Sequence, residues 1–380
     1  MSSSNAAGSP TDLEDPTHMD RTTIENAIRK LAADRELLTR FKANPSAVGG
    51  ELGLTGTVAA AIASGDRGAL RSLGVDSGLS ILVGRWFGDS AQDTARDTRF
   101  RVDHGIAVPP ADVPPGLVFA GGCSHVPDFL VRPEIDPADQ IERLGAGFRR
   151  LRTRLAAARP DVVIATADNH FQSFRTGGYV VGTGPRHTGS MAFFKRPDLD
   201  LAITGDEAFA RAIVSAARGA GLEIEEAPHI DLDHGLIVPL RELLPRPDLP
   251  VVPVLTQPAK TFSPFGARAL GQALRTVVRD SGRRVAMLAT GGLSHWLDPG
   301  KFGFVDVEFD TYLLDMMRAG RGPEVGDLEP LPLLEHGQYE FPNWLIMLGL
   351  VGPGVPAEVF AYEAMTASGG GWTVAEMRLP

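Results

Sequence analysis

The hydrophobic pattern between residues 22 and 87 is typical of helices and shows no strand-like alternation. Apolar residues recur at i, i+3, i+4 and i+7 from Ile24 to Leu31, which predicts a helix from Thr22 to about Phe41. Thr22 and Glu25 have the spacing of a capping box. Three shorter helical stretches are expected at 55–63, 69–73 and 79–87. We therefore expect residues 21–90 to form a small all-α module.

After residue 115 the pattern changes to short apolar runs that alternate with amphipathic stretches. The runs predicted as strands are 117–120, 162–167, 251–255 and 285–289, and the predicted helices include 138–155, 207–220, 267–278 and 305–318. The first of these helices is expected to be capped by Asp136, with Pro137 at its first position. This alternation predicts an α/β domain over 116–380, in which helices flank a central mixed sheet.

The remaining segments and the overall charge narrow the classes of protein. Residues 1–20 are rich in Ser, Pro, Thr and Asp and lack the basic start and apolar stretch of a signal peptide, so a disordered tail is expected. Residues 91–115 are polar and proline-rich and are predicted to be a linker. The net charge of -10 disfavours nucleic acid as a partner. No apolar run reaches the length of a membrane span, and the single cysteine, Cys123, favours a reducing cytoplasm.

Three of the nine histidines follow apolar runs that are predicted to be strands. They are His125, His170 and His295, and a fourth, His234, precedes the apolar stretch 236–240. Ligands of open α/β sheets bind beyond the carboxyl ends of strands. Any one of these histidines alone is more typical of a hydrogen-bonded loop residue than of a ligand. Their recurrence at strand ends favours a metal site or an acid/base site, and the pattern alone leaves the metal open.

The carboxylates are harder to assign from the pattern. Glu308 and Asp310 lie in a predicted helix and are expected on its solvated face. Glu335 and Glu340 lie on either side of His336, and Glu340 begins an otherwise apolar helix. A carboxylate in that place is usually a helix cap, but it is equally suited to point into a metal site.

Five motifs in a fixed order resemble the class III extradiol dioxygenases, typified by the β subunit of protocatechuate 4,5-dioxygenase. In chain order they are Ser124–Pro127, Asp168–His170 with Phe174, Asp233–Gly235 with Val238–Leu240, Gly291–His295, and Glu340 with Trp344–Met347. The helical module resembles the small α subunit of the same enzyme, through Phe41–Pro45, Gly53–Thr55, Gly65–Asp66 and Leu73–Gly74. The resemblance implies a fusion in which the small module covers the mouth of the catalytic domain.

The resemblance also implies the chemistry. His125, His170 and Glu340 would bind Fe(II) as a facial triad that leaves three positions open for a catechol and O2. His295 would be the general acid/base, a role that suits a side chain with an unperturbed pKa near 6.5. His234 would be a second catalytic histidine near the substrate, oriented by Asp233. The family also suggests a homodimer.

Two features depart from the family pattern. Asn169 separates Asp168 from His170, where family members place Asp directly before the ligand, so the hydrogen bond that orients His170 is not evident. The segment 363–372 differs from the substrate-binding end of the protocatechuate enzyme. Gallate, protocatechuate, aminophenol and larger diols therefore all remain open as substrates. A metal-dependent hydrolase and a non-catalytic metal-binding protein on the same scaffold are the alternatives, because three ligands with open positions also suit zinc-activated water.

Overall fold

The chain divides into two compact units, Met1–Gln92 and Asp93–Pro380. The structure, a computed structural model, describes residues 19–65, 67–75, 79, 83, 113–170, 174, 178–256, 263–296, 301–328 and 330–380. Nearly all of the expected tail at 1–20 and of the expected linker at 91–115, and most of the expected helix at 79–87, lie outside these ranges. No helix among the described residues is long and apolar enough to cross a membrane.

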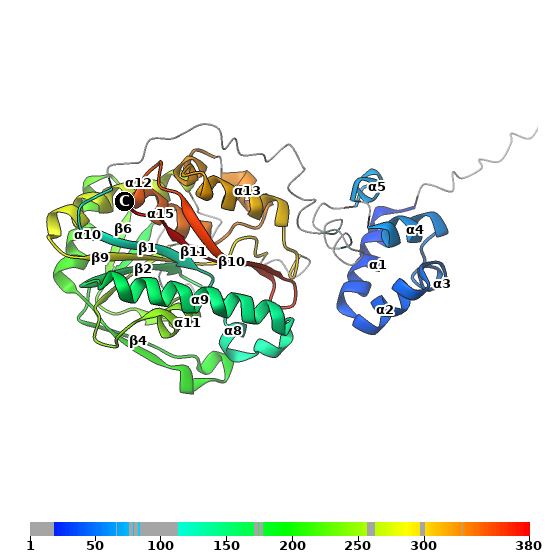
Figure 1. Ribbon diagram of the computed structural model, residues 1–380, viewed down its shortest axis with the longest axis horizontal. Coiled ribbons are helices and arrows are strands. Elements are labelled where there is room, and N and C mark those ends of the chain that lie inside the picture. The colour runs from blue at the N-terminus through cyan, green and yellow to red at the C-terminus, as the bar shows by residue number, and fades with distance from the viewer. Residues whose placement is uncertain are drawn as a thin grey trace, which may run out of the picture. The chain divides into compact units, whose positions relative to one another are not determined.

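The described residues of the first unit form five helices (Figure 1). They are α1 (Arg21–Ala33), α2 (Arg35–Ala43), α3 (Pro45–Glu51), α4 (Gly56–Ser64) and α5 (Arg67–Ser72). The single helix expected from Thr22 to Phe41 is wrong, because the chain breaks at Asp34, whose carboxylate accepts from the amides of Glu36 and Leu37 and starts α2. The predicted capping box is also wrong, since Asp20 occupies the N-cap of α1.

The second unit contains an eight-stranded mixed sheet in the order β10-β11-β1-β9-β2-β8-β3-β6. Its centre is four parallel strands, β1 (Leu117–Cys123), β9 (Val285–Thr290), β2 (Val162–Asp168) and β8 (Val251–Thr256). On one side lies the antiparallel hairpin β10 (Ala357–Met365) and β11 (Gly370–Met377), and on the other β3 (Tyr179–Gly182) and β6 (Ile224–Ala227). The α/β fold with a mixed sheet is as predicted.

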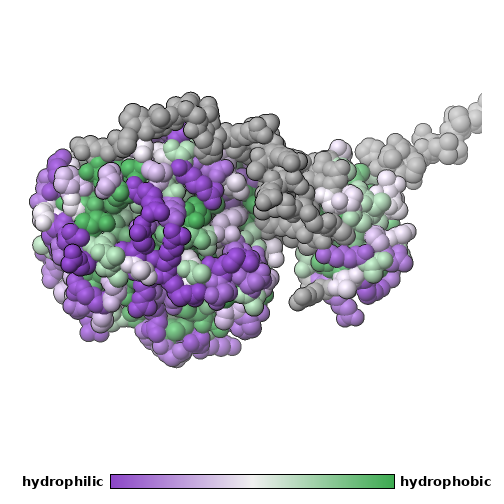
Figure 2. All heavy atoms as spheres, in the orientation of Figure 1, coloured by the Kyte–Doolittle hydropathy of each residue, from purple (hydrophilic) through white to green (hydrophobic). Residues whose placement is uncertain are grey.

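Helices cover both faces of this sheet because its central strands are apolar on both sides (Figure 1). α9 (Ala138–Ala158) and α11 (His234–Leu243) pack on one face, where they meet Val163 and Ala165 of β2. α10 (Glu207–Gly219), α12 (Pro264–Ser281), α13 (Val307–Arg318) and α15 (Phe341–Val351) pack on the other, around Ile164. On the face shown in Figure 2, hydrophilic side chains cover most of this unit and apolar patches are small.

Two further features place the ends of helices that carry site residues. α12 and α15 approach closely because glycine stands at the contact in both helices. A Cβ at Gly271 would lie 2.0 Å from the Ile346 carbonyl oxygen, and one at Gly349 would lie 2.3 Å from that of Arg268. A small sheet in the order β5-β4-β7, formed by Leu201–Thr204, Arg186–Gly189 and Asp231–Leu232, leads directly into α11. The N-terminal ends of α11 and α15 are thereby fixed beside the main sheet.

The start of α9 differs from the prediction by one residue. Pro137 is the N-cap and the helix begins at Ala138. Asp136 does not cap it. Its buried carboxylate instead accepts from the amide of Ser368, in the turn between β10 and β11. Pro137 therefore marks the start of the helix to within one residue, whereas the Asp136 side chain stabilises the β10–β11 turn and not the helix.

Candidate metal centre

The carboxyl ends of β1, β9 and β2 meet at one edge of the sheet, because these strands are parallel neighbours. His125 follows β1 by two residues and His170 follows β2 by two residues. The loop after β9 carries His295. Three sequence-predicted histidines therefore leave the same edge of the sheet, as their positions after apolar runs predicted.

His125 and His170 direct their Nε2 atoms toward a common point. Both Nε2 atoms are buried and have no hydrogen-bond partner among the described residues. The other ring nitrogens are held. Nδ1 of His125 lies 3.0 Å from Oγ1 of Thr290, and that hydroxyl donates to the Gly235 carbonyl, so it accepts from His125. Nδ1 of His170 donates to Oδ2 of Asp233 at 3.1 Å. Each imidazole consequently directs Nε2, which carries the lone pair when the ring is neutral, toward that point.

Glu340 supplies a carboxylate to the same point. Its Oε1 lies 3.2 Å from Nε2 of His125 and 3.9 Å from Nε2 of His170. Its Oε2 accepts from the amide of Gly292 at 2.5 Å. Although Glu340 occupies the N-cap of α15, its side chain makes no cap hydrogen bond, so the carboxylate serves the cluster and not the helix. Burial would raise the pKa of Glu340, but the adjacent imidazoles hold it well below its usual range.

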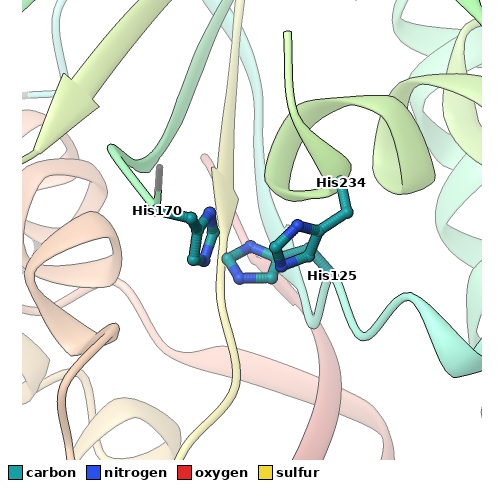
Figure 3. Close-up of side chains that lie close together, drawn as sticks. All are labelled: His125, His170 and His234. Carbon is teal, nitrogen blue, oxygen red and sulfur yellow. The ribbon is translucent and has the colours of Figure 1, made fainter. Parts of the chain in front are cut away.

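His234 joins the cluster from the first position of α11. The three rings of His125, His170 and His234 face one another (Figure 3), with centroids 4.2 Å apart for the last two. The sequence-based expectation that Asp233 orients His234 is wrong, because the Asp233 carboxylate bonds to His170 instead. Burial, together with the neighbouring His170, holds the pKa of His234 well below its usual value. His234 is therefore neutral near pH 7.

The Asp233 bond also explains the departure noted at Asn169. Asp168 does not orient His170. Its carboxylate accepts from Oγ1 of Thr256 and from Nδ2 of Asn343, both at 2.9 Å. Burial, with a contribution from the charge of Glu340, raises the pKa of Asp168 to about 7. Asp233, which the sequence analysis associated with His234, therefore orients His170.

His295 lies on the loop that follows β9 and is half-buried. Its Nδ1 is 2.8 Å from the carbonyl oxygen of Gly369, which can only accept, so Nδ1 carries the proton and Nε2 carries a lone pair. Its ring is 5.4 Å from that of Trp372 in β11. The same loop holds Glu340 through the Gly292 amide. His295 thus borders the cluster.

Two carboxylates were expected on a solvated helix face, and this expectation is wrong. Glu308 and Asp310 are both buried. Asp310 is fully enclosed and accepts hydrogen bonds from the loop that carries His295. The helix pattern missed this because α13 packs with its polar side against the β10–β11 hairpin, where hydrogen-bond donors replace water.

The donor set fits a divalent metal ion. Nitrogen atoms of His125 and His170 and carboxylate oxygens of Glu340 and Asp168 lie within 4.8 Å of one another, as do nitrogens of the three clustered histidines. Two aligned Nε2 lone pairs and an ionised carboxylate, each held by a second hydrogen bond, are the usual construction of a metal centre in proteins. Imidazole and carboxylate ligands suit iron and zinc alike.

A family model supplies the identification. The model of the "Catalytic LigB subunit of aromatic ring-opening dioxygenase" matches residues 120–373, which include all of the clustered side chains and His295. The chain belongs to this family. It is accordingly an aromatic ring-opening dioxygenase of the extradiol class, which decides against the hydrolase alternative.

Characterised relatives agree with the family. The chain is 26% identical to a 2-aminophenol 1,6-dioxygenase beta subunit of a Pseudomonas species, over 67% of this chain and 92% of that one. It is 31% identical to a 2,3-dihydroxyphenylpropionate/2,3-dihydroxicinnamic acid 1,2-dioxygenase of Mycolicibacterium vanbaalenii, over 45% of this chain and 54% of the relative. A Pseudomonas putida enzyme named for the same activity is 29% identical, over 47% of this chain and 58% of the relative. The chain thus spans about half the length of these last two dioxygenases.

Proposed function

We propose that this dioxygenase uses Fe(II), bound by His125, His170 and Glu340, to open a catechol-type ring with O2 into a semialdehyde or oxo-acid. The observation that carries the proposal is the convergence of two Nε2 lone pairs and one carboxylate oxygen at the sheet edge. Bound Fe(II) would supply open coordination positions and the redox chemistry that lets O2 react with an aromatic ring.

His295 acts as the general acid/base in this proposal. The Gly369 carbonyl holds the proton on Nδ1, so Nε2 is ready to accept a proton from a ring hydroxyl. The resulting imidazolium then returns that proton as the ring opens. The fixed Nδ1–H bond keeps the ring in one orientation for both transfers, which a freely rotating histidine would not do.

His234 acts as a neutral hydrogen-bonding group beside the substrate. Its lowered pKa keeps it uncharged, so it does not repel a cation held by the other two rings. Phe194 lies 5.3 Å from His234, and Trp372 lies 5.4 Å from His295, between ring centroids. The two catalytic histidines are therefore each backed by an aromatic side chain, which favours a flat apolar substrate ring.

The test is anaerobic loading of the purified chain with Fe(II) or Zn(II), followed by oxygen uptake with a panel of aromatic diols and 2-aminophenol. We expect oxygen uptake and a ring-opened product only with Fe(II). The 2-aminophenol arm is included because the relative that is covered almost completely acts on that compound by name. Activity with Zn(II), or no oxygen uptake with any compound, would contradict the proposal.

Variants connect the activity to the proposed ligands. Glu340→Gln removes the carboxylate charge at the cluster and is expected to abolish iron binding. Glu363→Gln is the matched control, because Glu363 is also buried but lies on the outer strand β10 and is paired with Arg143 of α9. Retention of iron in Glu340→Gln, measured by metal analysis after gel filtration, would remove Glu340 from the ligand set.

We further propose that residues 21–90 are a helical module related to the small α subunit and that 116–380 are the catalytic domain, joined by a linker at 91–115. The all-helical described part of the first unit supports this. Expression of 1–92 and 93–380 as separate chains should give an active complex on mixing. Full activity of 93–380 alone would refute a role for the module in catalysis, and sedimentation of the whole chain tests the expected dimer.

A further inference from the structure

Asp310 is a fully buried carboxylate whose oxygens are saturated by donors from three different segments. Oδ1 accepts from the amide of Ser294 at 2.9 Å and from Nε2 of Gln338 at 2.6 Å. Oδ2 accepts from Oγ of Ser294 at 2.8 Å and from the hydroxyl of Tyr362 at 2.7 Å. Four donors on two oxygens fill the usual capacity of a carboxylate, so the arrangement suits the ionised form.

These donors belong to segments that carry the proposed catalytic machinery. Ser294 directly precedes His295. Gln338 lies two residues before Glu340. Tyr362 is in β10, the first strand of the hairpin whose turn contains Gly369, the acceptor for His295. Asp310 itself is not part of the metal cluster and belongs to the far helix α13.

The peptide group between Ser294 and His295 is also held at both of its polar atoms. The Ser294 carbonyl accepts from the Gly371 amide at 2.9 Å, and the His295 amide donates to the Gly337 carbonyl at 2.8 Å. The Ser294 hydroxyl also accepts from the amide of Asp306. A side chain at Gly371 would collide with Asp310, because a Cβ there would lie 2.1 Å from Oδ2. The hairpin and the histidine loop are thus packed directly around this carboxylate.

We propose that Asp310 is a positioning residue for His295: it fixes the Ser294–His295 backbone so that Nδ1 meets the Gly369 carbonyl and Nε2 faces the substrate. The inference rests on the acid/base role of His295 in the proposed function. It adds a residue that touches neither metal nor substrate but on which the geometry of proton transfer depends. A misplacement of a catalytic group by about 1 Å costs on the order of 10²-fold in rate.

The test is a double-variant cycle with the Fe(II)-loaded enzyme and the best substrate from the panel. Asp310→Asn keeps the shape and removes the charge. We expect kcat to fall roughly 10- to 100-fold, while KM and bound iron change little. In the His295→Ala background the same change should alter kcat by less than about threefold, because the group that Asp310 positions is gone. If Asp310 had a merely structural role, Asp310→Asn would lower kcat by the same factor in the wild-type and His295→Ala backgrounds.

Ser294→Ala provides a second route if Asp310→Asn folds poorly, because it deletes only the bridging hydroxyl, and the same dependence on His295 is expected. Asp206→Asn is the matched control: Asp206 caps α10, away from His295, and pairs with Arg283 in the loop between α12 and β9. Three outcomes would overturn this inference and leave the proposed function intact: an unchanged kcat in Asp310→Asn, an equal loss of kcat in both backgrounds, or loss of iron. Wild-type activity in His295→Ala would overturn it together with the acid/base assignment, and an inactive wild type would overturn the proposed function itself.

Discussion

Replacement of Asp233 by Asn tests how strongly the hydrogen bond behind His170 supports metal binding. Asp233 is largely buried at the start of α11, where Oδ2 accepts from Nδ1 of His170 and Oδ1 accepts from the Gly235 amide at 2.7 Å. An asparagine has one acceptor oxygen in place of two, so it loses one of these bonds and its NH2 group faces a donor. Burial would by itself lower the pKa of His170, but the bond to Asp233 and the nearby Glu340 raise it well above its usual value.

The expected effect is about 10- to 100-fold weaker Fe(II) affinity, since removal of the hydrogen-bond partner of a metal-bound histidine typically has that cost. This corresponds to roughly 1.4–2.7 kcal/mol of binding free energy. Asparagine caps helices about as well as aspartate, so its oxygen can keep the Gly235 bond and the free energy of unfolding of the metal-free protein should change little. Metal affinity and metal-free stability are measured separately.

The assay is anaerobic titration of metal-free protein with Fe(II) against a competing chelator, with chemical denaturation of the same samples. Asp206→Asn is again the matched control, because Asp206 caps α10 as Asp233 caps α11 and accepts from the Phe209 amide at 3.0 Å. Both variants can keep the cap bond, so both should show similar, small changes in the free energy of unfolding, and only Asp233→Asn should lose Fe(II) affinity. Equal Fe(II) affinity in Asp233→Asn and wild type would refute the claim that Asp233 supports His170 as a ligand.

Three further outcomes follow from particular contacts. Gly235→Ala should lose bound iron, because its Cβ would lie 2.8 Å from Cε1 of His170; metal analysis showing full iron would contradict this. Cys123 is buried and its thiol pKa is raised by burial, so thiol reagents should label it only after unfolding, as mass spectrometry can show. Burial, with the adjacent His229, lowers the pKa of His187 to about 4. A lowered folded-state pKa gives stability that is complete above the unfolded value near 6.5 and is lost as pH falls toward 4. Urea denaturation should show a loss of at most about 3 kcal/mol between pH 7 and 4 that His187→Gln lacks.

The central strands and long helices could be predicted because their apolar runs are continuous, and β1, β2, β8 and β9 lie within a few residues of the expected positions. The strands of the small sheet could not, since they are two to four residues long and have no room for an alternating pattern. β11 was missed because its two glycines, Ala375 and Glu376 weaken its strand signal. The backbone hydrogen bonds to β1 stabilise β11 as a strand in spite of its composition.

The candidate site was predictable where chemistry coincides with strand ends. His125 and His170 follow parallel strands, and that topology brings them together. The residues that hydrogen-bond to these histidines could not be predicted. Thr290 and Asp233 are far along the chain from His125 and His170, so no sequence motif contains both partners. Asp310 was placed on the solvated side of its helix for the same reason. A helical pattern shows which positions are polar but not whether water or a donor-rich loop covers them.

The N-terminal turn of α11 is the common support of both imidazoles, and this links the metal centre to the packing of the domain. Gly235 accepts from the Thr290 hydroxyl that holds His125, and its amide donates to the carboxylate that holds His170. α11 packs against α9 and β2, which fixes the position of this turn relative to the strand ends. A shift of α11 would therefore disturb the hydrogen bonds behind both imidazoles at once, whereas Glu340 is held separately through α15 and Gly292. Substitutions in the α9–α11 contact should consequently affect iron affinity before they unfold the domain.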